Sequence, residues 1–98
     1  MNFNDKVYNL CKMIPKGKVS TYKEIAKALD SRGYRAVGNA LNKNPYAPVI
    51  PCHRVVSSTA HLHGFFHGLE AKRKLLESEG VKIKNNKVID FEKVLFRF

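Results

Sequence analysis

The stretch VIPCHRVV, residues 49–56, constrains the fold of this chain of 98 residues more than any other segment. It is too apolar for a surface loop and too short for a helix, so we expect a buried extended segment. Three chemically active side chains, Cys52, His53 and Arg54, stand side by side inside it. The fold must therefore bring a thiol, an imidazole and a guanidinium group into or beside its core.

Size and composition indicate one small globular domain. The 98 residues suffice for one domain, and 44% of them are apolar. No apolar run approaches the roughly 20 residues that span a bilayer, and the N-terminus lacks the apolar stretch of a signal peptide. We therefore expect a soluble intracellular protein, cytoplasmic and nucleoid-associated, or nuclear in a eukaryote. Its two cysteines, Cys11 and Cys52, form no C-x-x-C pair, which predicts free thiols and no structural zinc site.

Amphipathic spacing predicts four helices, within residues 2–14, 20–30, 34–42 and 69–80. Cys11 falls on the apolar face of the first helix, which indicates a small core residue. Thr21 and Glu24 fit a capping box at the start of the second helix. A break that contains glycine joins the second helix to the third, so this pair resembles a helix-turn-helix whose recognition helix is residues 34–42.

The C-terminal part completes the predicted fold. Leu69, Leu75 and Leu76 are expected to face the core from the last helix, which Gly80 ends. Alternating apolar residues around Asn85-Asn86 predict a β-hairpin, the wing. The fold class is therefore mainly α with a small β element, in a single winged helix-turn-helix-like domain over residues 1–98.

The distribution of charge points to a polyanionic partner. The formal net charge is +10, and no carboxylate occurs between Asp30 and Glu70. A central segment without anionic side chains suits a surface that approaches the phosphates of DNA or RNA. The alternative is general basicity that serves solubility.

Cys52 is a candidate nucleophile. A free thiol has a pKa near 8.5, so it needs a base or a cation close by to react at neutral pH. His53 is adjacent in the sequence, and a histidine in this role needs a carboxylate to orient it. That carboxylate must come from outside the acid-free segment, and Glu77 and Glu79 are the candidates. The alternative is a buried cysteine beside a histidine with an ordinary hydrogen bond.

Three motifs in order resemble one known family. The motif PCHRVV is preceded by RAVGNALNKNP and followed by GLEAKRKLLESEG, and the similarity runs from about Gly17 to Gly80. Together they resemble the C-terminal domain of O6-alkylguanine-DNA alkyltransferases. The resemblance implies a single-turnover repair reaction without a cofactor. A guanine alkylated at O6 is flipped out of double-stranded DNA, which a monomer binds through the minor groove, and a cysteine keeps the alkyl group.

The resemblance also assigns roles to residues of the site. Cys52 would accept the alkyl group, His53 would act as the base through a water, and Glu79 would orient His53. Asn44 would pin the turn between recognition helix and active site. Tyr22 would help to rotate the nucleotide and protonate the departing guanine at N3, whereas without the resemblance Tyr22 is a half-buried core tyrosine.

Further residues are assigned to DNA and to the pocket. Arg35 would fill the hole that the flipped base leaves in the stack, or else it is a solvated charge. The small residues of the recognition helix would allow close approach to the minor groove, or else tight helix packing. The expected DNA contacts are Thr21, Tyr22, Arg35, Ala36, Gly38 and Asn39. The expected pocket residues are Pro51, Val55, Phe65 and Phe66.

Two departures from the family pattern leave questions open. The N-terminal domain that usually precedes this one is missing, so we expect a natural minimal form, a separated domain or part of something longer. In the loop HLHGFFHG, Phe66 replaces a typically small residue and His63 and His67 replace expected glycines, which predicts a narrow pocket that favours methyl groups. A metal site at His61, His63 and His67 is disfavoured because no fourth ligand has suitable spacing.

Two other functions compete with alkyl transfer. Alkyltransferase-like proteins share this domain and bind the same lesions without transferring the alkyl group, but they lack the cysteine. Cys52 argues against this assignment. A plain winged-helix transcription factor is the third reading, and it gives the buried PCHRVV segment no purpose.

Overall fold

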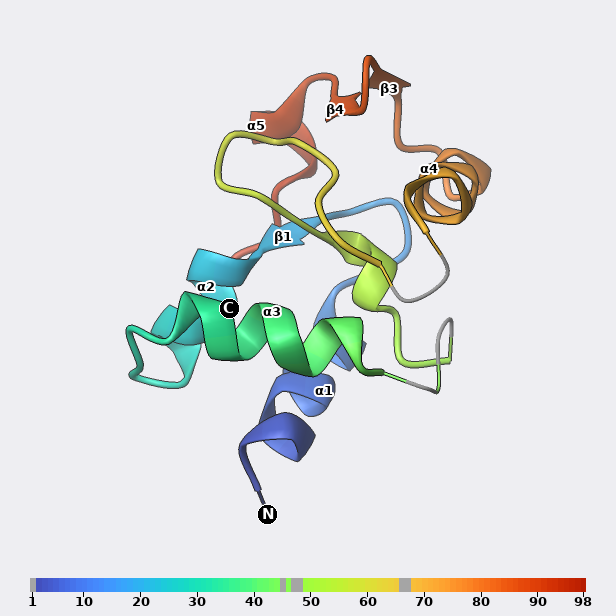
Figure 1. Cartoon of the computed structure of the whole chain (residues 1–98). Coiled ribbons are helices and arrows are strands. Elements are labelled where there is room, and N and C mark those ends of the chain that lie inside the picture. The colour runs from blue at the N-terminus through green and yellow to red at the C-terminus, as the bar shows by residue number, and fades with distance from the viewer. Residues whose placement is uncertain (1, 45, 47–48, 66–67) are drawn as a thin grey trace.

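The computed structural model describes residues 2–44, 46, 49–65 and 68–98, and these form a mostly helical fold with two small sheets (Figure 1). The helices are α1 (Phe3–Met13), α2 (Tyr22–Ala28), α3 (Tyr34–Asn42), the 3-10 helix η1 (Cys52–Arg54), α4 (Leu69–Ser78) and α5 (Phe91–Val94). The strands are β1 (Ser20–Thr21), β2 (Val55–Val56), β3 (Ile83–Lys84) and β4 (Lys87–Val88). The predicted fold class is confirmed. No helix in the described parts of the chain is long and apolar enough to cross a membrane.

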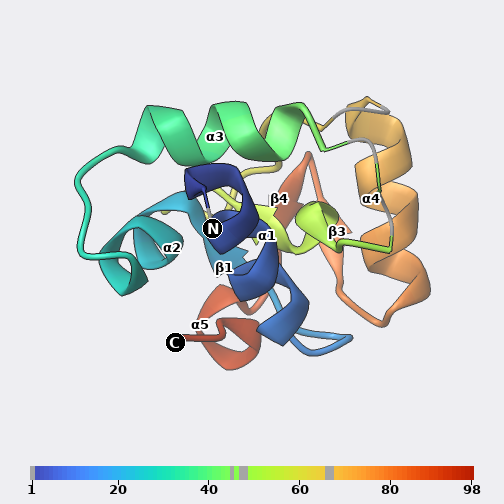
Figure 2. The same cartoon turned by 90° about the horizontal axis from the view of Figure 1, so that it is seen from below.

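Helix α1 forms the centre of the helix-turn-helix half of the molecule. The Asn2 side chain caps it by accepting a hydrogen bond from the Asp5 amide at 2.8 Å. Val7 and Cys11 on its apolar face are fully buried, as the spacing predicts. The Tyr8 hydroxyl donates to the Ala40 carbonyl at 2.8 Å and so ties α1 to α3. Figure 2 shows α1 with α2 and α3 packed beside it.

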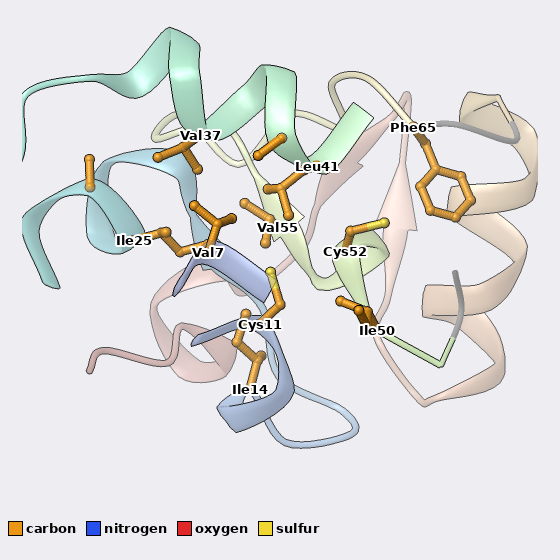
Figure 3. Close-up of a cluster of buried hydrophobic side chains, with 12 residues drawn as sticks. Val7, Cys11, Ile14, Ile25, Val37, Leu41, Ile50, Cys52, Val55 and Phe65 are labelled. Carbon is orange, nitrogen blue, oxygen red and sulfur yellow. The ribbon is translucent and has the colours of Figure 1, made fainter. Parts of the chain in front are cut away.

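The core consists of two clusters of buried apolar side chains. The first cluster joins α1, α2, α3 and η1, and it includes Val7, Cys11, Ile25, Val37, Leu41, Cys52 and Val55 (Figure 3). The second cluster lies under the wing and α4, and it includes Val19, Val56, Leu62, Leu76, Val81 and Val88. Strands β1 and β2 pair in parallel between the clusters, with Ser20 opposite Val55. The segment PCHRVV therefore runs along the boundary of both clusters.

Two expectations about buried segments need correction. The run at residues 49–56 is buried from Ile50 onward except at Arg54, which is partly exposed. It is extended only at Val55–Val56, because Cys52–Arg54 forms a 3-10 turn in which the Arg54 amide donates to Pro51 O. Leu69 is 40% exposed and does not face the core. Lys72, one turn further along α4, takes the buried position instead.

Of the two hydrogen bonds of the predicted capping box at the start of α2, the one accepted by Thr21 is confirmed. The Thr21 hydroxyl accepts from the Glu24 amide at 3.0 Å, as expected of an N-cap. The carboxylate of Glu24 lies 4.0 Å from the Arg97 Nε. The C-terminal tail is thereby drawn toward the helix-turn-helix.

The predicted wing is confirmed. Strands β3 and β4 pair antiparallel around Asn85 and Asn86, which have φ angles of 53° and 58°. Positive φ at both central residues is the signature of a type I′ turn, whose twist matches that of the paired strands. Asparagine tolerates this left-handed region better than other residues with a Cβ.

Substitution of Asn86 tests whether the wing depends on this backbone geometry. Because Asn86 is exposed, Asn86→Val removes no buried contact but forces a β-branched side chain into the left-handed region. We expect the free energy of unfolding to fall by about 1–2 kcal/mol in urea titration. Asn86→Gly is the control and should stay within about 0.5 kcal/mol of the parent. Equal losses in both variants would contradict the turn assignment.

Candidate active site

Cys52 is the first residue of η1 and is almost completely buried. Its residue is 3% exposed, and it belongs to the same core cluster as Cys11 and Phe65 (Figure 3). Both cysteines are free thiols. Burial raises the pKa of the Cys52 thiol, although a hydrogen bond with the Asn44 side chain and the charge of Lys72 oppose this effect. The thiol is therefore largely protonated at neutral pH, and it needs a base to react as a thiolate.

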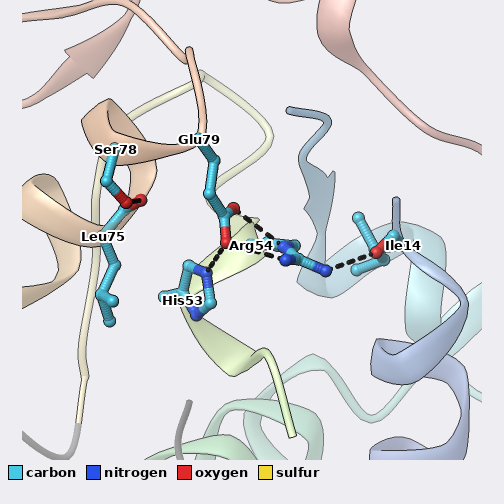
Figure 4. Close-up of polar contacts among 6 residues, drawn as sticks. All are labelled: Ile14, His53, Arg54, Leu75, Ser78 and Glu79. Atoms are coloured by element: carbon cyan, nitrogen blue, oxygen red, sulfur yellow. Dashed lines mark hydrogen bonds and ion pairs between the residues drawn. The ribbon is translucent and has the colours of Figure 1, made fainter. Parts of the chain in front are cut away.

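The Glu79 carboxylate joins three parts of the chain (Figure 4). His53 Nε2 lies 3.0 Å from Glu79 Oε2. Arg54 donates through Nε to Oε1 at 2.9 Å and through its second terminal nitrogen to Oε2 at 2.7 Å, which is a bidentate pair. Arg54 also donates to the Ile14 carbonyl at the end of α1, at 2.9 Å. Of the two carboxylates expected as candidates, Glu79 reaches His53, whereas Glu77 pairs with Arg73.

The electrostatics of this cluster define the state of His53. Burial lowers the pKa of His53, and the nearby Glu79 opposes the shift only in part. Burial would raise the pKa of Glu79, but hydrogen bonds from Arg54 and His53 outweigh it, and the net shift is downward. A neutral His53 then donates from Nε2 to the carboxylate and keeps a free lone pair on Nδ1. Nδ1 is buried, and no described residue hydrogen bonds to it.

Asn44 is fully buried and holds the turn that leads to Cys52. Its amide nitrogen donates to the Ile50 carbonyl at 3.0 Å, and its side-chain oxygen accepts from the Tyr46 amide at 2.9 Å. The first bond links the end of α3 to the residue two positions before the cysteine, and the second holds the intervening loop at Tyr46. The side chain thus constrains the path between α3 and η1.

A cavity of about 340 Å³ lies between α2, α3 and the loop at residues 63–64. Its described lining residues are Tyr22, Tyr34, Arg35, Gly38, Asn39, Leu41, Asn42, His63 and Gly64. The Tyr22 hydroxyl donates to the His63 carbonyl across this cavity, and burial raises the pKa of Tyr22. A Cβ on Gly38 would meet no atom within 4 Å, so this face of α3 is open.

The structure brings the expected residues together in part. Arg35, Ala36 and Asn39 are exposed on α3, whereas Thr21 is buried and its hydroxyl is engaged in the helix cap. The expected pocket residues Pro51, Val55 and Phe65 are buried, but they and Cys52 are not among the described residues that line the cavity. The rings of Phe65 and His53 form a T-shaped pair, with 6.4 Å between their centroids. Phe66 and His67 lie outside the described residues.

Two parts of the site escape the reasoning from sequence. One is the bidentate clamp of Arg54 on Glu79, because the motif PCHRVV contains Arg54 but does not indicate which carboxylate pairs with it. The other is Lys72, which is fully buried beside the site. Lys72 lies four residues before Leu76 and therefore on the apolar face of α4, so this spacing could have predicted that Lys72 is buried.

Fold and site together define a winged helix-turn-helix domain that buries a thiol beside a histidine–carboxylate pair. The sequence model of 6-O-methylguanine DNA methyltransferase, DNA binding domain, matches residues 2–81, and the chain belongs to this family. The resemblance drawn from the motifs is confirmed. The methylated-DNA–protein-cysteine methyltransferase of Sulfolobus acidocaldarius is 52% identical over 83 residues, which cover 85% of this chain and 52% of that protein. The chain thus spans about half the length of the curated relatives it matches.

Two solved structures are similar to this one. The O6-methylguanine-DNA methyltransferase of Pyrococcus kodakaraensis KOD1 is 45% identical with a TM-score of 0.76, over 83% of this chain and 47% of that chain. S. pombe Atl1, in complex with damaged DNA containing O6-carboxymethylguanine, is 30% identical with a TM-score of 0.86. This second similarity covers 98% of this chain and 95% of Atl1.

Glu79→Gln tests the electrostatic role of the shared carboxylate. Because the pKa of Glu79 is lower in the folded state, its contribution is complete above the unfolded value near 4.5 and is lost as pH falls through the folded value. We expect Glu79→Gln to lower the free energy of unfolding by about 2–3 kcal/mol at pH 7, and the difference to shrink toward pH 3. Urea titrations at both pH values measure it.

Glu77→Gln is the matched control, because Glu77 lies two residues before Glu79 and forms an exposed ion pair with Arg73, four residues earlier on α4. It should change the free energy of unfolding by less than about 0.5 kcal/mol. Similar losses in Glu79→Gln and Glu77→Gln, or a loss in Glu79→Gln that does not depend on pH, would argue against the clamp.

Proposed function

We propose that this protein repairs DNA by transferring a methyl or other alkyl group from O6-alkylguanine to Cys52, in a single turnover. The observation that carries the proposal is the buried Nδ1 of His53, the residue that follows Cys52, which has no hydrogen-bond partner among the described residues while Glu79 holds the other ring nitrogen. Family membership supports the substrate class. The substrate also implies that the protein acts where DNA is, in the cytoplasm or a nucleus.

The proposed reaction is one displacement. The thiol proton of Cys52 passes to Nδ1 of His53, through a water as the resemblance implies, and the Glu79 carboxylate stabilises the imidazolium that forms. The thiolate attacks the alkyl carbon, an S–C bond forms, and the bond from carbon to the guanine oxygen breaks. Guanine departs as an anion and takes a proton from the Tyr22 hydroxyl. Cys52 remains alkylated.

The DNA is proposed to bind across α3. Arg35 and Asn39 lie on the open side of this helix beside Gly38, and both line the cavity next to Tyr22. A helix face with small residues can approach the narrow minor groove, and an inserted Arg35 offsets part of the cost of unstacking the base. Phosphates are attracted by the net charge of +10. Asn44 would keep the helix in register with Cys52.

Cys52→Ala separates chemistry from binding. The variant removes the sulfur and leaves the His53–Glu79–Arg54 contacts intact, so we expect it to bind methylated duplex DNA normally and transfer nothing. Transfer of labelled methyl from an oligonucleotide and mass spectrometry of the Cys52 peptide measure this. Parent protein should gain the mass of one methylene at Cys52. Cys11→Ala, the control, should still react; methyl found on Cys11 or on no residue would falsify the proposed function.

Arg35→Ala tests the proposed insertion into the base stack. We expect the preference for DNA with O6-methylguanine over undamaged DNA to fall by about tenfold, which is about 1.4 kcal/mol. Arg32→Ala removes an exposed charge just before α3 and should weaken binding to both DNAs equally. Fluorescence anisotropy with both duplexes gives the ratio. An unchanged ratio in Arg35→Ala would mean that Arg35 contacts phosphate rather than the stack.

A lesion reader without efficient transfer is the second candidate. The similarity to Atl1 over nearly the whole of both chains favours it. The burial of Cys52 also fits a protein that binds the base without reacting. Mass spectrometry distinguishes the two functions, since a reader retains an unmodified Cys52 while bound to the lesion.

A further inference from the structure

Lys72 is a fully buried cation whose three N–H donors match three backbone carbonyls. Its Nζ lies 2.6 Å from Val55 O, 3.0 Å from His63 O and 3.1 Å from Gly64 O. A protonated lysine has three donors and no acceptor, so the ammonium group is satisfied as long as it keeps its charge. Burial of a charge is costly, and replacement by an apolar side chain would avoid that cost. The presence of a buried lysine at this position therefore indicates a role beyond filling the core.

The three carbonyls belong to the two sides of the candidate active site. Val55 follows η1 directly and is the first residue of β2, the strand that comes after Cys52 and His53 in the chain. His63 and Gly64 form part of the wall of the 340 Å³ cavity. Lys72, from α4, is thus the contact that fixes the cavity wall relative to the strand that follows the cysteine.

The His63 carbonyl has a second donor, the Tyr22 hydroxyl. If Tyr22 is to donate its proton to a bound guanine, it must release this carbonyl. With Lys72 in place, His63 O keeps a partner when Tyr22 turns to the base. Without Lys72, this part-buried carbonyl would be left to water on release of Tyr22, and the 63–64 wall would lose its link to the strand at Val55.

We propose that Lys72 is a positioning residue for alkyl transfer, which holds the 63–64 wall of the cavity in place and leaves the Tyr22 hydroxyl free to act on the base. This inference rests on the proposed function. The groups that face Lys72 are Cys52 of η1, Cys11 of α1 and Tyr22 of α2, and the positive charge of Lys72 also acts on His53.

The charge on Lys72 titrates in an accessible range. Burial lowers its pKa to about 8, while Cys52 and Cys11 raise it only in part. Above pH 8 the neutral amine has two donors for three carbonyls. Burial raises the pKa of Tyr22, Cys11 and Cys52 and lowers that of His53, so Lys72 is the one of these groups whose pKa lies near pH 8. The Cys52 thiolate fraction grows over the whole range, so the transfer rate should rise with pH, and the slope of its logarithm against pH should decrease near pH 8 as Lys72 loses its charge.

The test is the pH profile of the single-turnover methyl transfer rate from pH 6 to 9.5, for the parent, Lys72→Met and Lys72→Arg. We expect Lys72→Met to transfer at least about tenfold more slowly at pH 7, with no decrease in slope near pH 8. Lys72→Arg keeps a charge at every pH of the range, so it should recover part of the rate and also lack the decrease in slope. Lys74→Met is the control, because Lys74 is exposed on the same helix, and it should match the parent.

The outcomes separate this inference from the proposed function. If the parent transfers no methyl at any pH, the proposed function fails. If the parent transfers methyl but the slope of its log rate against pH does not decrease near pH 8, or if folded Lys72→Met reacts within twofold of the parent at pH 7, the role of Lys72 is overturned. Circular dichroism establishes which variants are folded, and the profile of the parent decides alone if both Lys72 variants unfold.

Discussion

The site depends on one carboxylate that is shared between two cations. Glu79 holds His53 through one oxygen and Arg54 through both, and Arg54 in turn reaches the last turn of α1. The end of α4, the 3-10 turn and α1 are thus connected through a group that is only 9% exposed. Because Arg54 keeps the carboxylate ionised, Glu79 fixes the tautomer of His53 without taking its proton. The ion pair between Arg54 and Glu79 therefore sets the orientation of His53, the residue that follows Cys52, although Cys52 takes no part in that pair.

Much of this arrangement follows from local sequence patterns. The stop at Pro15, the Thr21 cap and the Asn85-Asn86 turn predict helices and wing because each depends on a few neighbouring residues. Residue types and order within PCHRVV indicate a thiol and a base, and the family resemblance supplies Glu79 as the partner. The 3-10 turn at Cys52 was missed because it depends on burial on both sides of the segment, which overrides the preference of an apolar run for extended structure.

The same limit explains Leu69 and Lys72. The apolar periodicity of α4 favours leucine over lysine on the buried face of the helix. It carries no information about the three carbonyls that converge at one point of that face. These carbonyls come from β2 and from the loop at 63–64, which are 8 to 17 residues away along the chain. Once they are placed, a lysine donates to all three of them, whereas a leucine would donate to none. The polar group is placed by tertiary structure and not by the pattern of its own helix.

The two cysteines show how such polar groups turn a core position into a candidate reactive one. Cys11 is fully buried, and burial raises the pKa of its thiol. Cys52 belongs to the same cluster, but the hydrogen bond of Asn44 and the charge of Lys72 act on its thiol in the opposite direction. Lys72 also acts on Cys11, where no amide accompanies it. Reactivity therefore depends on the buried polar residues that act on each sulfur, and η1 places Cys52 where both the Asn44 side chain and the charge of Lys72 act on its thiol.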